Sequence, residues 1–233
     1  MEFTIVNGQI FTPGLAIVDA PQPYTPLGGD TLHIALDVSG NGQLPLTSDD
    51  DAPTRFHEIT LFLTSEEKER NLTISNGTSI SSSSDSPAYV GPILDLEPNS
   101  TVKHVNWVWP DCFVGDEDDN RDKDSARGNY NISMHQSFRW NGTEYYTVFE
   151  LPISVSNGIE ASRERVECGL LENEFAVGPS VASNQSLPGQ PWVGDGIQTG
   201  SEGEEGGGGA LGGGGGGRVL RWVVFGLVVG MVL

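Results

Sequence analysis

Positively charged side chains are the scarcest feature of this 233-residue sequence, in which 12 Lys and Arg stand against 32 Asp and Glu, for a formal net charge of −20. A chain with so few cations has little with which to displace the counterions of phosphates, so nucleic acid is excluded as a partner. Neither a Gly-x-y period nor sustained heptads occur, which excludes a collagen and a coiled coil.

Catalytic signatures are also lacking. The sequence contains no G-x-S-x-G motif, no phosphate-binding loop and no Cys/His metal spacing. His57-Glu58 opens like a zinc-protease helix, but Leu61 stands where the second His belongs. The four histidines are expected on separate strands, which leaves a copper site unsupported.

An acidic run at residues 116–124 spaces its carboxylates like the start of a calcium loop. Calcium loops require Gly at the sixth position and Glu at the twelfth, and here Arg121 and Arg127 occupy those positions. A solvated acidic loop is therefore the favoured interpretation. We predict no catalytic residue, no cofactor and no metal site, and hence no enzyme. A paired-carboxylate site stays open as an alternative because 32 acids always allow some pair.

Sites for N-glycosylation are abundant. About one Asn-x-Ser/Thr sequon per hundred residues is expected by chance, and this sequence has six. The predicted glycosylation sites are Asn71, Asn76, Asn99, Asn131, Asn141 and Asn184. An excess of this kind favours a secreted chain, and the alternative is a cytosolic surface rich in Ser, Thr and Asn.

The C-terminus combines a Gly-rich stretch with an apolar end. Of the 31 glycines, 11 lie within residues 203–217, and 12 uncharged, mostly apolar residues follow from Trp222 to Leu233. A helix of that length spans ~18 Å, short of the ~30 Å hydrocarbon core. Small residues, a spacer and a terminal apolar tail form the signal for a glycosylphosphatidylinositol (GPI) anchor, whose attachment site is predicted at Gly208, Gly209 or Ala210. A tail anchor or an aggregation-prone end is the alternative.

The N-terminus does not match this picture. A secretory signal needs a basic segment and an apolar stretch of 7–15 residues, whereas MEFTIVNGQI has an acid at position two. Either the true first exon lies upstream or the secretion hypothesis is wrong. The anchor signal favours the first, because an anchor requires translocation.

Short alternating segments dominate residues 1–158. The predicted strands are 11–18 (interrupted by Pro13-Gly14), 31–38, 56–64, 72–74, 102–109, 130–138 and 145–155. In the sixth of them Tyr130, Ile132, Met134 and Phe138 are expected inside, and Asn131, Ser133, His135 and Ser137 outside. Asn141-Gly142 signals a hairpin turn, and Tyr130 is a candidate tyrosine corner. Glycans at Asn131 and Asn141 are expected to leave the core undisturbed.

This pattern predicts an all-β fold, an antiparallel β-sandwich of the immunoglobulin or fibronectin-III type. Residues 159–177 form an expected C-terminal extension with some helical character. Residues 178–217 are expected to be a disordered Pro/Gly/Ser-rich linker with the anchor site, and residues 218–233 the apolar attachment tail.

The sequence contains two cysteines, Cys112 and Cys168. In an oxidising compartment such a pair is usually bonded, which would attach the extension to the domain. Closing this loop would stabilise the fold by ~4 kcal/mol on the chain-entropy model. Two unrelated free thiols are the alternative.

Several phrases of the sequence resemble segments of uncharacterised secreted proteins of filamentous fungi. The phrases are PGLAIVDAPQPYTPLGGDTLHIALDVSGNGQLP, STVKHVNWVWPDC, NYNISMHQSF and YYTVFELPISV, within roughly residues 9–158. The resemblance implies a signal peptide, a β-rich domain and a GPI-type tail. It implies no activity, so no site residue is carried over.

The function expected from these observations is that of a GPI-anchored, N-glycosylated surface or cell-wall protein with a structural, adhesive or ligand-binding role. Its expected partners are the membrane, through the lipid anchor, and cell-wall polysaccharide or a surface protein. The alternatives are a secreted enzyme acting on wall polysaccharide and a secreted, host-directed effector.

Overall fold

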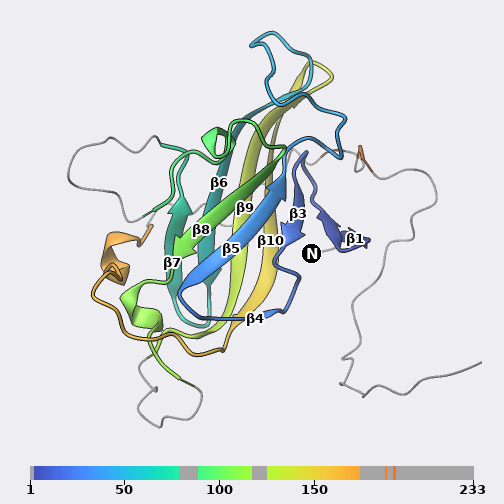
Figure 1. Ribbon diagram of the computed structural model, residues 1–233. Coiled ribbons are helices and arrows are strands. Elements are labelled where there is room, and N and C mark those ends of the chain that lie inside the picture. The colour runs from blue at the N-terminus through green and yellow to red at the C-terminus, as the bar shows by residue number, and fades with distance from the viewer. Residues whose placement is uncertain (1–2, 79–88, 117–124, 174–186, 188–190, 193–233) are drawn as a thin grey trace, which may run out of the picture. The chain divides into compact units, whose positions relative to one another are not determined.

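The described part of the chain contains ten β-strands and three short 3-10 helices, with no α-helix among them. The computed structural model describes residues 3–78, 89–116, 125–173, 187 and 191–192 (Figure 1). The strands are β1 Thr4–Val6, β2 Gln9–Phe11, β3 Ile17–Ala20, β4 Pro26–Leu27, β5 Thr31–Asp37, β6 Arg55–Ser65, β7 Arg70–Ser75, β8 Val102–Val108, β9 Gly128–Trp140 and β10 Thr143–Val155. The 3-10 helices are η1 Ile93–Asp95, η2 Asp111–Phe113 and η4 Cys168–Leu170.

The strands form two sheets. Sheet A has the order β1-β2-β3-β5-β8, and all its neighbours are antiparallel. Sheet B has the order β4-β10-β9-β6-β7, in which only the short β4–β10 pair is parallel. Figure 1 shows β5 and β8 lying across the face formed by β6, β9 and β10.

One apolar core lies between the sheets. Leu32, Ile34 and Leu36 of β5 pack in the same cluster as Ile132 and Leu151 of sheet B, and each is at most 2% exposed. Alternating side chains of both sheets supply this core, as the alternation in the sequence predicts. The prediction of an all-β fold built from two mostly antiparallel sheets is confirmed.

The predicted hairpin between 130–138 and 145–155 is also confirmed. β9 ends at Trp140 and β10 begins at Thr143, and the two residues between them, Asn141 and Gly142, have φ angles of 50° and 82°. Positive φ at both positions is the reason why Asn-Gly is favoured in such turns.

The predicted strand 11–18 is wrong as a single element. β2 ends at Phe11 and β3 begins at Ile17, so Pro13-Gly14 lies in the connection between two strands. Proline cannot donate to a strand ladder, and Gly14 lies against Gln136, which a Cβ at Gly14 would approach within 2.5 Å. The break in the pattern therefore separates β2 from β3.

The C-terminal extension is tied to sheet A, and the predicted disulfide is confirmed. Cys112 and Cys168 are bonded, with their Cα atoms 6.0 Å apart. Arg165, whose side chain is 2% exposed, donates to the carbonyl of Trp109 (3.0 Å) and pairs with the carboxylate of Asp30 (3.0 Å). The helical character predicted for this segment amounts, within residues 160–173, to the single turn η4.

The packed part of the chain continues into the predicted linker. Leu187 and Trp192 are 9% exposed and join a second apolar cluster with Leu15 and Phe138. The indole Nε1 of Trp192 donates to the carbonyl of Leu15 at 2.8 Å. The linker prediction therefore overlooked these two anchoring side chains.

The remaining C-terminal predictions lie outside the described residues. These include the anchor positions Gly208, Gly209 and Ala210 and the apolar tail at 218–233. Within the described ranges, none of the helices is long and apolar enough to cross a membrane.

Candidate functional site

The outer face of sheet B holds polar side chains that are buried although they point away from the core. Ser133 and His135 of β9 are 3% and 5% exposed. The prediction that they are exposed is wrong. Both side chains point to the outer face as predicted, but side chains of the neighbouring strands cover them. Phe62 of β6 and Tyr146 of β10 pack edge-on against the His135 ring, with ring centroids 5.1 Å and 5.9 Å from it.

Ser133 and His135 belong to a continuous hydrogen-bonded chain of four side chains on this face, which we call the relay: Tyr146, which is 37% exposed, His135, Ser133 and the half-buried Glu150. His135 Nδ1 lies 2.7 Å from the Tyr146 hydroxyl, and His135 Nε2 lies 3.1 Å from Ser133 Oγ. Ser133 Oγ donates to Glu150 Oε1 at 2.7 Å. Thr64 Oγ1 lies 3.5 Å from the other oxygen of Glu150.

The donor and acceptor of each hydrogen bond in the relay follow from the groups at its two ends. Since Ser133 donates its proton to the Glu150 carboxylate, its oxygen accepts from His135 Nε2–H. His135 Nδ1 is then unprotonated and accepts from the Tyr146 hydroxyl. Burial lowers the pKa of His135 and so favours this neutral imidazole. Burial also raises the pKa of Tyr146, which keeps its hydroxyl a donor.

The relay is not a nucleophilic triad. In a triad the acid orients the histidine, and the histidine accepts the serine proton. Here the acid accepts the serine proton, and a tyrosine hydroxyl bonds the other nitrogen of the histidine. With Ser133 3% exposed, its oxygen is also closed to a substrate. The relay instead fixes the position of the Glu150 carboxylate.

A groove of about 730 Å³ opens beside the relay on this face. Ser133, His135 and Glu150 belong to its lining, and the β6–β7 turn borders it with Glu66, Glu67 and Glu69. Tyr24 also lines it. The main-chain N–H of Tyr24 donates to the carbonyl of Pro152 at 2.7 Å, while its ring is 72% exposed. A groove of this size is typical of ligand sites, which span roughly 300–1,000 Å³.

The groove is acidic and rich in amides. Its lining contains four glutamates and one arginine, Arg70, whose guanidinium is paired with Glu172. Asn129 and Asn131 supply side-chain amides, and Asn71 also belongs to the lining. Carboxylates and amides offer many hydrogen-bond acceptors and some donors, and the Tyr24 ring offers an apolar face. This combination suits a hydroxyl-rich ligand with an apolar face.

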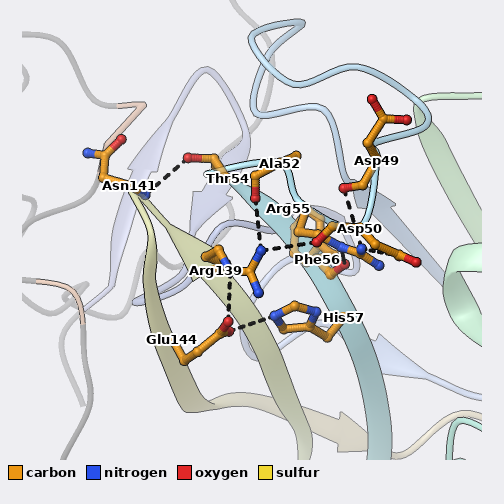
Figure 2. A network of polar contacts seen from close by, with 10 residues as sticks. All are labelled: Asp49, Asp50, Ala52, Thr54, Arg55, Phe56, His57, Arg139, Asn141 and Glu144. Carbon is orange, nitrogen blue, oxygen red and sulfur yellow. Dashed lines mark hydrogen bonds and ion pairs between the residues drawn. The ribbon is translucent and has the colours of Figure 1, made fainter.

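A second polar network lies at the other end of the same strands (Figure 2). Arg139 of β9 donates to Glu144 Oε1 (2.7 Å) and to the carbonyls of Asp50 (3.1 Å) and Ala52 (3.3 Å). His57 Nε2 lies 2.6 Å from the second oxygen of Glu144. These contacts tie the loop before β6 to the β9–β10 hairpin.

The charges of this second network are fixed by its own partners. The hydrogen bond from Arg139, followed by that with His57, lowers the pKa of Glu144. The bond from Arg55 likewise lowers the pKa of Asp50. A carboxyl with a lowered pKa is a poor general acid near neutral pH. The network therefore acts as a clamp on the turn that carries Asn141, and it does not line the groove.

The predicted glycosylation sites occupy different environments. Asn99 and Asn141 are exposed, while Asn71, Asn76 and Asn131 are partly buried. Asn71 and Asn131 both line the groove. Asn184 lies outside the described residues.

Among the described residues, the histidines do not form a metal-ligand group. The four histidines lie on four strands, as expected: His33 on β5, His57 on β6, His104 on β8 and His135 on β9. One group of described residues has metal-ligand spacing, Asp111 with Cys112 and Cys168, but its two sulfurs form the disulfide. Residues 117–124 of the acidic run lie outside the described residues.

Comparisons of this chain with protein-family models, with curated proteins and with solved structures give no match. The groove and the sequence signals therefore remain as the indications of function.

Proposed function

We propose that this protein is a GPI-anchored, N-glycosylated module of the cell surface or cell wall, and that its groove binds wall polysaccharide. The six sequons and the C-terminal anchor signal support the location. The Cys112–Cys168 disulfide agrees with an oxidising compartment. A relation to secreted glycoproteins of filamentous fungi is part of the same proposal.

We also propose that the two sheets form an immunoglobulin-like sandwich. In sheet B the order β7-β6-β9-β10 corresponds to C′-C-F-G of an immunoglobulin variable-type sheet, and β3-β5-β8 corresponds to A-B-E. Tyr130, near the start of β9, donates its hydroxyl proton to the carbonyl of Ala126 at 2.6 Å. This is the bond expected of a tyrosine corner. Both features support an immunoglobulin-like assignment.

The groove carries the binding proposal. Sugars present hydroxyl groups around a ring with apolar C–H faces. The carboxylate of Glu150, fixed by Ser133, and the glutamates of the β6–β7 turn can accept from the hydroxyls. The exposed ring of Tyr24 can cover a C–H face. Fixed acceptors beside an aromatic platform lower the ordering cost of binding.

The test is oligosaccharide binding by the full chain, purified in detergent from a host that adds no N-glycans. Titration with soluble β-glucan and chitin oligosaccharides should give saturable binding without turnover. Tyr24→Ala should weaken it about tenfold, the equivalent of one lost aromatic contact. Glu150→Gln, which keeps the shape of the side chain, should weaken it as well.

Asn106→Ala on β8 of sheet A is the matched control, because Asn106 is exposed and belongs to the opposite sheet. Equal affinity of all three variants and the parent chain would remove the groove from the proposal. Saturable binding followed by cleavage of the oligosaccharide would favour the secreted enzyme instead.

The anchor has its own test. Phosphatidylinositol-specific phospholipase C should release the protein from intact membranes. Recovery of a C-terminal peptide that contains Trp222 from the mature surface protein would contradict an anchor at Gly208, Gly209 or Ala210.

A further inference from the structure

We infer that the N-glycan of Asn131 occupies this groove, so that glycosylation at this one sequon controls whether the groove can take an external polysaccharide. The control of access to the groove rests on the proposed function. The seating of the glycan in the groove concerns the chain alone and can be tested separately.

The position of Asn131 directs its glycan into the groove. Asn131 lies in the middle strand of sheet B, on the outer face, opposite Thr64 of β6 and Pro152 of β10. All three residues line the groove, and Asn131 is partly buried there. A sugar joined to its side-chain nitrogen therefore starts inside the groove and has lining residues on both sides.

The amide nitrogen of Asn131 is available for the linkage. Among the described residues, its side chain makes no hydrogen bond, whereas the other sequon in the groove is engaged. Asn71 Nδ2 donates to the carbonyl of Asn173 at 2.8 Å, and Asn71 Oδ1 is buried. A sugar at Asn71 would have to displace this contact, while a sugar at Asn131 displaces none.

The lining suits the first sugars of an N-glycan for the same reasons as it suits wall polysaccharide. A volume of about 730 Å³ is enough for a drug-sized ligand, and the glycan is attached to a residue of the lining. Attachment gives the glycan a high effective concentration in the groove, so that weak contacts with Tyr24 and Glu150 suffice to hold it. A free oligosaccharide must compete with this tethered one.

Asn141 provides the internal contrast. It too begins a sequon, Asn-Gly-Thr against Asn-Ile-Ser at Asn131, but it is exposed at the β9–β10 turn and does not line the groove. Its glycan has no sheet face on which to lie and should extend into solvent.

The experiment uses the full chain from a glycosylating host, with peptide mapping to establish occupancy at each sequon. Native protein is treated with an endoglycosidase, and trimming is followed site by site. We expect the Asn131 glycan to resist trimming while the Asn141 glycan is removed. After denaturation both should be trimmed at the same rate, and Tyr24→Ala should abolish the resistance at Asn131.

Oligosaccharide binding is then compared between glycosylated parent chain, Asn131→Gln and Asn141→Gln. If the glycan fills the groove nine-tenths of the time, the parent should bind about tenfold more weakly than Asn131→Gln. Asn141→Gln should bind like the parent.

The outcomes separate the two proposals. An unoccupied Asn131, or trimming at Asn131 as fast as at Asn141, overturns the inference and leaves the proposed function intact. Resistance at Asn131 with no binding in any variant upholds the seated glycan and removes the polysaccharide function. Equal binding by an occupied parent and Asn131→Gln overturns the control of access.

Discussion

A histidine on the outer face of sheet A is exposed, whereas a histidine on the outer face of sheet B is buried. On sheet A the His104 side chain is 54% exposed and has one polar side-chain partner, Glu97, at 2.9 Å. On sheet B His135 is 5% exposed and is bonded at both nitrogens. His33, His104 and Asn106 on the face of sheet A are exposed, whereas sheet B carries the relay and the groove on its outer face.

Neighbouring side chains cause the difference. Across from His104 stands Ala35 of β5, whose side chain is a single methyl group. Near His135 stand Phe62 and Tyr146, and Val148 lies directly opposite on β10. Large flanking side chains remove His135 from water, and a buried imidazole must then have hydrogen-bond partners. Burial thus explains why both nitrogens of His135 have partners within the protein.

The largest expected effect comes from uncovering His135. Phe62→Ala removes a ring that is 8% exposed and should lower the free energy of unfolding by about 3 kcal/mol. Val108→Ala on sheet A, where the side chain is 48% exposed, should change it by no more than about 0.5 kcal/mol. Urea unfolding of both variants checks the comparison, and equal losses would mean that the two faces are equivalent.

The next effect comes from breaking the relay. Ser133→Ala leaves the buried N–H of His135 without an acceptor and should cost about 2 kcal/mol. Because this change also destroys the Asn131 sequon, the measurement needs protein without N-glycans. Ser133→Thr restores a hydroxyl and should recover part of the loss. Asn106→Ala, which breaks the exposed 2.7 Å contact with His33, is the matched change on sheet A and should cost about 0.5 kcal/mol or less. A loss at Ser133 no larger than this would contradict the relay.

The smallest effect is a dependence on pH. The pKa of His135 is lowered by burial from its ordinary value of 6.5, so the unfolded chain binds more protons once the pH falls below 6.5. Stability contributed by the neutral imidazole is complete above pH 6.5 and is lost as the pH falls toward the lowered pKa. The slope cannot exceed about 1.4 kcal/mol per pH unit for one proton.

Two other groups of sheet B, Tyr146 beside His135 and Glu144 in the second network, titrate outside this window. Tyr146 titrates far above it, since burial raises its pKa. The clamp carboxyl Glu144 has a pKa lowered from 4.5, so its contribution is lost only below that value. His135→Gln should therefore flatten the profile of unfolding free energy between pH 8 and 5. A profile unchanged by this substitution would show that His135 does not titrate differently on folding.

The sequence determined by itself that the fold is all-β. Alternation at 31–38, 102–109 and 145–155 places an apolar side chain at most of the alternate positions, and strand geometry then fixes which side chains form the core. Asn141-Gly142 likewise determined the hairpin, because few other residue pairs accept two positive φ angles. The two cysteines could be paired because only one pairing exists within the chain.

Only the tertiary structure decided where the site lies. Strand parity correctly placed Ser133 and His135 on the outer face, but their burial depends on Phe62, 71 residues before Ser133, and on Tyr146 across the hairpin. In the same way, Tyr24 and the β6–β7 turn border one groove because β4 and β6 pair with β10 and β9 in one sheet. Local patterns report which way a side chain points, whereas exposure depends on what the neighbouring strands bring beside it.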